Sequence, residues 1–287
     1  MNSRVFPSLE LERLSLCPDT PARPIGVFDS GVGGLSILRA LRIELPHEDF
    51  VYFADSRHAP YGERDDAHVL SRSRSITQQL RNDHHIKALV IACNTATAAA
   101  VHVLRAEHPD LPIIGVEPAL KPAVSLSLTR RIGVMATRGT LSSAKFQTLL
   151  QSQAGLADFV LQPCDGLADA IEHQDDEKIA ALCQHYQQKM GSFGLKTGEI
   201  DTLVLGCTHY PFASQALHTA VGSAIRFIDT GEPVARHTHQ LLLNRQIPLK
   251  MSTSSSEDLL ASGRLTLLSS GSQTALEAAS ARWLPPV

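Results

Sequence analysis

The stretch Leu89-Val-Ile-Ala-Cys93-Asn94-Thr95 has the pattern of a buried β-strand that ends in a cysteine and leads into a helix. Its apolar residues follow one another without alternation, which is typical of a strand covered on both faces. A second stretch, Leu203-Val-Leu-Gly-Cys207-Thr208-His209, has the same build about one domain length further along the chain. Two domains of similar build, each with a cysteine at the carboxyl end of a strand, would explain this repeat.

The rest of the chain alternates short apolar runs with segments of helical periodicity. Strands are predicted at Ile25–Phe28, Phe50–Ala54, Ala88–Ala92, Ile113–Val116, Ile132–Ala136, Phe159–Leu161, Leu203–Gly206 and Arg226–Ile228. Helices are predicted between them, for example at Leu35–Leu45, Ala67–Arg81, Ala96–Glu107, Ser142–Gln153, Glu177–Lys189 and Phe212–Val221. This alternation predicts the α/β class, with parallel sheets and helices on both faces. Ligands of such sheets bind beyond the carboxyl ends of the strands, so candidate site residues should follow the strands directly.

Composition excludes several classes of protein. The chain has 287 residues, of which 43% are apolar and 19% charged, and its net charge is −3. It is long enough for two domains, and its charge argues against a protein that coats nucleic acid or an anionic membrane. No apolar run has the length of a membrane helix, and Met1–Pro24 lacks a secretory signal. We expect residues 1–23 to form an N-terminal extension and residues 251–258 to form an exposed loop.

The cysteines do not form a disulfide framework. Their number is odd, their spacing is wide and no C-x-x-C pair occurs, so a structural zinc site is not expected either. The five are Cys17, Cys93, Cys164, Cys183 and Cys207. Free thiols without an export signal indicate a reducing, cytoplasmic location. Cys17, Cys164 and Cys183 are expected to be bystanders.

A glycine-rich loop follows the first predicted strand, in Phe28-Asp29-Ser30-Gly31-Val32-Gly33-Gly34. It matches neither the dinucleotide fingerprint nor the Walker pattern, and a small carboxylate suits it better than a nucleotide. A tight strand–helix turn that needs glycine is the alternative. Asp29 beside such a loop indicates a functional carboxylate, one that orients a proton carrier or binds an ammonium group.

Cys93 and Cys207 are the candidate reactive groups. Cys93 precedes a helix that Asn94 or Thr95 could cap, and a helix N-terminus favours a thiolate. Cys207 has a titratable partner in His209, so the pair could also be the nucleophile and base of a hydrolase. A second thiol is not needed for that chemistry. Two thiols suit inversion of a chiral carbon, in which one group removes a proton from one face and another returns a proton to the opposite face.

Five motifs resemble those of the glutamate racemases, a family of cofactor-independent aspartate/glutamate racemases, and occur in the same order. They are FDSGVGGLS (28–36), ADSRHAPYGER (54–64), ACNTATAA (92–99), GVEPALKPA (115–123) and GCTHYP (206–211). The resemblance covers roughly residues 24–283. It implies that Cys93 takes the proton from D-glutamate with the help of Asp29. It implies that Cys207 takes it from L-glutamate with the help of His209, and that Glu172 is a further acid.

The resemblance also implies a set of substrate contacts: Asp29, Ser30, Tyr61, Gly62, Asn94, Thr95, Thr137, Thr140, Thr208 and His209. Hydroxyls, amides and backbone N–H groups of this kind suit two carboxylates and an ammonium group. Without the family, Tyr61-Gly62 could be only a turn, and Thr137 and Thr140 could only cap a helix.

The family implies two pseudo-symmetric parallel-sheet α/β domains with the active site at their interface. We expect one domain to comprise residues 24–117 and 228–287, and the other residues 118–227. The implied activity supplies D-glutamate for peptidoglycan, hence for cell-wall biogenesis and cell shape, and requires no metal, pyridoxal phosphate or nucleotide. The sequence leaves a homodimer open. An aspartate-specific racemase, a Cys207–His209 hydrolase and a non-catalytic glutamate-binding protein are the alternatives.

Overall fold

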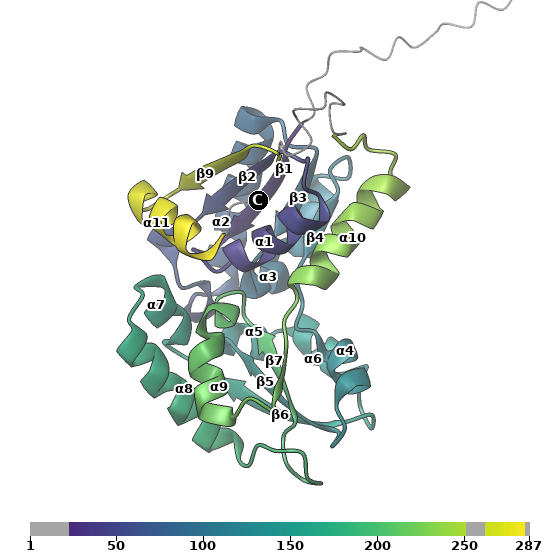
Figure 1. The fold of residues 1–287 in the computed structure, drawn as a ribbon. Helices are drawn as coiled ribbons and strands as arrows, with labels where there is room; N and C mark the ends of the chain where they lie inside the picture. Colours follow the sequence, from purple (N-terminus) through teal and green to yellow (C-terminus); the bar gives the residue numbers. More distant parts are fainter. Residues whose placement is uncertain (1–22, 251–261, 285–287) are drawn as a thin grey trace, which may run out of the picture.

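The computed structural model describes residues 23–250 and 262–284, and it contains two separate sheets whose strands are all parallel (Figure 1). The first sheet has the order β4 (Ile113–Gly115), β3 (Ala88–Ile91), β1 (Ile25–Asp29), β2 (Phe50–Ala54) and β9 (Leu265–Ser269). The second has the order β6 (Asp158–Pro163), β5 (Arg131–Ala136), β7 (Thr202–Gly206) and β8 (Arg226–Ile228). The predicted fold class, two parallel-sheet α/β domains, is confirmed. Most of the expected extension and the loop at 251–258 lie outside the described residues.

Helices cover both faces of the first sheet. One face is covered by α1 (Leu35–Glu44), α10 (Gly231–Asn244) and α11 (Gln273–Trp283), and the other by α2 (Asp66–His84) and α3 (Asn94–Glu107). Successive residues of a strand point to opposite faces, so Ile25 and Val27 join the core under α1 and Phe28 joins the core under α2 and α3. This double burial is the reason that the strands are apolar without alternation.

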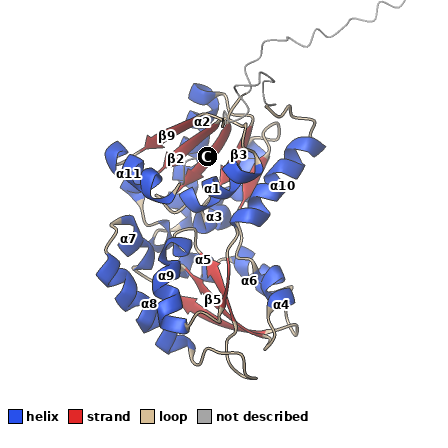
Figure 2. Cartoon of the chain, in the orientation of Figure 1, coloured by secondary structure: helices blue, strands red, loops and turns tan. Residues whose placement is uncertain are grey.

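The second sheet is covered in the same way (Figure 2). One face packs against α7 (Leu167–Glu172), α8 (Asp176–Met190) and α9 (Ser214–Val221), and the other against α4 (Leu120–Leu126) and α6 (Ala144–Gln151). In β7, Leu203 and Leu205 point to the first of these faces and Val204 to the second. A stacked aromatic pair, Phe212 and Trp283, packs against the largest cores of both sheets, with ring centroids 4.2 Å apart.

The short elements at the ends of strands differ most from the sequence prediction. The helix expected at 142–153 is α6, and a separate short helix, α5 (Arg138–Ser142), ends where the expected helix begins. The Ser143 hydroxyl separates the two, because it caps α6 by accepting a hydrogen bond from the Phe146 N–H at 3.1 Å. The helix expected from Phe212 begins with a 3₁₀ turn, η3 (Tyr210–Ala213), before α9. The edge strand β9 was not predicted. Within the described ranges, no helix combines the length and apolar character needed to cross a bilayer.

The chain passes between the two sheets twice, after β4 and after β8, so the second sheet is inserted between parts of the first. β8 ends at Ile228, next to the expected boundary at 227. The domain boundaries themselves stay a prediction. The residues that follow the strands of both sheets meet at one pocket, which places the candidate site where the two carboxyl edges face each other.

Candidate active site

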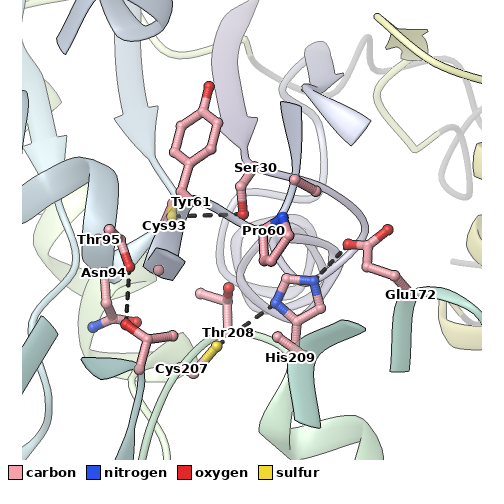
Figure 3. A pocket seen from close by; sticks show the side chains of 14 residues that line it. Ser30, Pro60, Tyr61, Cys93, Asn94, Thr95, Glu172, Cys207, Thr208 and His209 are labelled. Atoms are coloured by element: carbon pink, nitrogen blue, oxygen red, sulfur yellow. Dashed lines mark hydrogen bonds and ion pairs between the residues drawn. The ribbon is translucent and has the colours of Figure 1, made fainter. Parts of the chain in front are cut away.

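The pocket between the sheets, called the interdomain pocket below, is lined by side chains from both domains (Figure 3). The lining residues are Ser30, Ala59, Pro60, Tyr61, Gly62, Cys93, Asn94, Thr95, Thr137, Ala168, Glu172, Cys207, Thr208 and His209. About 370 Å³ of its space is free of protein atoms, and part of that space is open to solvent. The two sulfur atoms therefore face one pocket although they follow strands of different sheets.

Cys93 is the N-cap of α3, which corrects the expectation that Asn94 or Thr95 caps this helix. Cys93 has an extended backbone and its Sγ accepts a hydrogen bond from the Ala96 N–H at 3.4 Å, whereas Asn94 already belongs to the helix. The Ser30 hydroxyl lies 3.8 Å from the same sulfur. The end of β3 thus places the thiol at the N-terminus of α3, where it lines the pocket.

The surroundings of Cys93 favour the thiol over the thiolate. Burial raises the pKa of the Cys93 thiol, and the nearby Asp29 carboxylate raises it further. The Ala96 N–H opposes both effects but does not overcome them. The helix terminus alone predicted the opposite preference, because sequence pattern does not measure the desolvation of a group that is 5% exposed. Cys93 is therefore set up to donate a proton, and it needs a neighbouring base in order to accept one.

Asp29 is fully buried at the end of β1 and lies behind the pocket wall. Its carboxylate accepts hydrogen bonds from the Gly31 N–H at 2.9 Å and, from the other domain, from the Thr208 hydroxyl at 3.2 Å. Burial raises the pKa of Asp29 to about 6, although the charge of His209 and the Gly31 N–H act in the opposite direction. A carboxyl group with this pKa can both take and release a proton near neutral pH.

Cys207 belongs to a different arrangement, a hydrogen-bonded chain with His209 and Glu172. The Cys207 Sγ lies 3.7 Å from His209 Nδ1, and His209 Nε2 lies 2.5 Å from Glu172 Oε1 (Figure 3). Burial lowers the pKa of His209, but the contacts with Cys207 and Glu172 outweigh it and raise the pKa well above its ordinary value. His209 therefore favours the imidazolium form, which places a cation beside the Cys207 sulfur.

The glycine loop makes room for this chain. A Cβ atom at Gly31 would collide with the Glu172 carboxylate, and one at Gly33 would collide with the His209 ring. The Val32 N–H donates to Glu172 Oε1 at 2.6 Å. The small carboxylate that the loop holds is thus one of the protein's own, and both earlier interpretations, an anion cradle and a tight turn, describe part of its role.

Threonines and an amide form the remaining polar wall. The Thr95 and Thr137 hydroxyls lie 3.0 Å apart, and Thr137 also caps α5. Thr140 does not line the pocket, because its hydroxyl lies behind that pair, 2.9 Å from Thr137. The Asn94 Nδ2 is buried beside the pocket without a hydrogen-bond partner. A buried amide of this kind is costly unless a ligand accepts its hydrogen bond.

Asp29, Glu172 and His209 also form the one group of three potential metal ligands found in the described part of the chain, with ligand atoms within 4.8 Å of one another. Their atoms already take part in hydrogen bonds with Gly31, Thr208, Val32 and each other. This connectivity fits a network that holds and moves protons better than an open metal site.

The sequence-predicted residues other than Asp29 and Thr140 all line the interdomain pocket. Ala59, Pro60 and Ala168 complete its wall without having been predicted. Pro60 lies within a motif already singled out, whereas nothing in the sequence around Ala168 distinguishes it from an ordinary helix residue.

The Asp/Glu/Hydantoin racemase family model matches residues 35–238. The chain belongs to this family. A glutamate racemase from Ralstonia pickettii (strain 12J) is 51% identical over 221 residues, which are 76% of either chain. A crystal structure of a glutamate racemase isoform from Bacillus anthracis has a TM-score of 0.76 at 31% identity and covers 91% of this chain and 93% of its own. One from Francisella tularensis in complex with D-glutamate has a TM-score of 0.74 at 25% identity, with coverages of 92% and 94%.

Proposed function

We propose that the protein is a glutamate racemase, which interconverts L- and D-glutamate by proton transfer at Cα between two cysteines. The observation that carries the proposal is the placement of Cys93 and Cys207, from two different sheets, on one pocket with separate proton-handling neighbours. Relatives that bear this name are 45–51% identical over about three quarters of the chain. The solved relative from Francisella tularensis holds D-glutamate.

In the direction from L- to D-glutamate, His209 first takes the Cys207 proton, which leaves a thiolate. The thiolate sulfur removes the Cα proton of L-glutamate, and the electron pair of the broken C–H bond stays on the substrate. The Cys93 thiol donates its proton to the opposite face and becomes the thiolate. The imidazolium at His209, held by Glu172, balances the charge of the Cys207 thiolate before the transfer.

The reverse direction uses Cys93 as the base. Asp29 takes its proton, Cys93 removes the Cα proton of D-glutamate, and the Cys207 thiol protonates the other face. In both directions the developing negative charge is stabilised by hydrogen-bond donors that the fold holds in place. We place the unpartnered Asn94 amide and the Thr95–Thr137 hydroxyl pair on the substrate carboxylates. The proposal uses side chains alone and requires no cofactor.

The proposal extends to a physiological role. Bacterial peptidoglycan contains D-glutamate, and the racemase family to which the motifs point supplies it. A cytoplasmic location is part of the proposal, and it is supported by four buried free cysteines among the described residues. The homodimer left open by the sequence is tested by sedimentation of the purified protein.

The decisive experiment follows L-glutamate in D₂O. We expect the circular dichroism of the solution to decay to zero while solvent deuterium enters Cα, as read by mass spectrometry. Binding of glutamate without deuterium incorporation would show a non-catalytic binding protein. Faster decay with aspartate than with glutamate would assign the enzyme to aspartate.

A thiol hydrolase is a second candidate. Cys207, His209 and Glu172 are arranged as the nucleophile, the base and the carboxylate that orients the base. That function uses Cys207 alone. It predicts that Cys93→Ala retains turnover of an ester or amide substrate, whereas racemisation requires both sulfurs.

A further inference from the structure

The turn at residues 59–62 forms one wall of the interdomain pocket. Ala59, Pro60, Tyr61 and Gly62 all line the pocket. The turn also reaches the second domain, because a Cβ atom at Gly62 would press on Thr137, and one at Gly139 would lie 3.2 Å from the Gly62 carbonyl oxygen. A segment that touches both domains and the pocket must be held in place for the pocket to keep its shape.

The buried carboxylate of Asp55 holds this turn through a hydrogen bond from Tyr61. The Tyr61 side chain is 1% exposed and its hydroxyl donates to Asp55 Oδ2 at 2.5 Å. Asp55 is fully buried directly after β2, and its backbone N–H donates to the Asp29 carbonyl at 3.0 Å. The connection therefore runs from the turn to the strand that carries a proton-handling residue of the proposed site.

Arg72 of α2 completes the arrangement with a two-pronged contact. Its Nε and Nη2 donate to the two oxygens of Asp55, each at 2.9 Å. Hydrogen bonds from Arg72 and Tyr61 keep the pKa of Asp55 below its ordinary value although burial alone would raise it. The carboxylate thus stays charged, and its planar fork with arginine fixes its orientation.

We propose that Asp55 and Arg72 are positioning residues that hold the 59–62 turn over the substrate and so set the affinity for glutamate. Neither residue lines the pocket, so both act through Tyr61. The inference rests on the proposed function for its substrate. The motif at 54–64 contained Asp55, but its role depends on Arg72, which lies outside that motif on α2.

The test compares Tyr61→Phe, Arg72→Ala and Arg72→Lys with a control on the same helix. Arg74 lies two residues after Arg72 on α2, forms an exposed ion pair with Glu107 and does not touch the turn. Arg74→Ala is therefore the matched control. We expect Tyr61→Phe and Arg72→Ala to raise KM for glutamate about 10-fold, the value of one charged hydrogen bond, with kcat changed less than about 3-fold. Arg74→Ala should leave both constants unchanged.

Two further measurements separate positioning from a general loss of stability. Guanidinium ion should restore the KM of Arg72→Ala towards that of the wild type, while Arg72→Lys, which lacks the fork, should stay impaired. Titration with racemic glutamate, in which no net turnover occurs, should show the same loss of affinity. Urea unfolding of each variant reports its stability. Tyr61→Phe leaves the Asp55–Arg72 pair intact and tests the inference even if Arg72→Ala does not fold.

An unchanged KM in Tyr61→Phe would overturn the inference, and so would an equal rise in KM for Arg74→Ala. A wild-type protein that binds glutamate without racemising it would instead contradict the proposed function, and the titration would still test the role of Asp55 and Arg72.

Discussion

A cysteine follows each of the strands β3 and β7, but the surroundings of the two sulfurs differ. Cys93 caps a helix beside the buried carboxyl group of Asp29, whereas Cys207 precedes a 3₁₀ turn and lies beside the His209 ring. One thiol is kept protonated by burial, and the other has a cationic neighbour. The repeated backbone pattern places the sulfurs, and residues from elsewhere in the fold give each sulfur its own electrostatic surroundings.

Substrate and product are mirror images, and this limits which kinetic quantities can reveal a difference between the two halves of the site. L- and D-glutamate have the same free energy in water, so the equilibrium constant of the reaction is one. The ratio kcat/KM must then be equal in the two directions for every variant. Differences between the two halves of the site can therefore be measured only in kcat, in KM or in isotope effects.

Removing either sulfur should cost the most activity, because it takes away one of the two proton carriers. Cys93→Ala and Cys207→Ala should each lower kcat/KM for both enantiomers by roughly 10³-fold or more, because each direction needs one base and one acid. Circular dichroism of L- and of D-glutamate solutions measures this loss. Cys164→Ala is the control, since this buried thiol lies outside the pocket. Substantial racemisation by either pocket variant would rule out the two-cysteine mechanism.

Replacing the residue beside each sulfur tests whether the two halves of the site serve separate cysteines. We expect His209→Asn and Asp29→Asn to lower kcat/KM by roughly 10²-fold, the usual share of one acid or base. In His209→Asn, transfer at Cys207 becomes slower, so the primary isotope effect on kcat/KM should rise with Cα-deuterated L-glutamate and fall with the D-enantiomer. Asp29→Asn should give the reverse pattern, because it slows transfer at Cys93.

His173→Asn supplies the control for that experiment. His173 follows Glu172 but is exposed and contacts Asp169 rather than the pocket. Its replacement should leave rates and isotope effects unchanged. The same isotope pattern in His209→Asn and Asp29→Asn would show that the two halves do not serve separate sulfurs.

The contrast between the two halves also shows what sequence could and could not predict. Each cysteine, Asp29 and the fold class followed from apolar runs that end in polar residues. Glu172 came from family resemblance alone, because its contact with His209 depends on how α7 packs beside η3. The capping role of Cys93 was missed, since sulfur is an unusual cap and Asn94 and Thr95 are the common ones.

The burial of individual carboxylates is the second property that could not be predicted from the sequence. The pattern around Asp29 could not reveal that its carboxylate is fully covered, nor that Thr208 of the other domain donates to it. Asp55 is equally buried after the next strand, but Arg72 keeps it charged. Two aspartates at neighbouring strand ends thus have opposite pKa shifts, because only one has an arginine partner.

The smallest expected effect concerns Asp29 and pH. Its pKa is about 6 in the folded protein and 3.8 without burial, so between these values the folded state retains a proton that the unfolded state has lost. Stability should therefore fall as pH rises from 4 to 6, by at most about 3 kcal/mol. In the same range kcat/KM should rise, because the carboxylate is the form that accepts the Cys93 proton.

Asp29→Asn removes the titrating group and should flatten this contribution to both curves. The difference in unfolding free energy between wild type and variant, measured in urea at each pH, reports Asp29 and the groups coupled to it, such as His209, because distant groups contribute equally to both proteins. The wild type should lose stability relative to the variant as pH rises from 4 to 7. A difference that does not change with pH would mean that Asp29 is ionised throughout this range, and the assignment of Asp29 as the proton acceptor for Cys93 near neutral pH would lose its basis. The two sulfurs would then differ in their neighbours without differing in how those neighbours titrate.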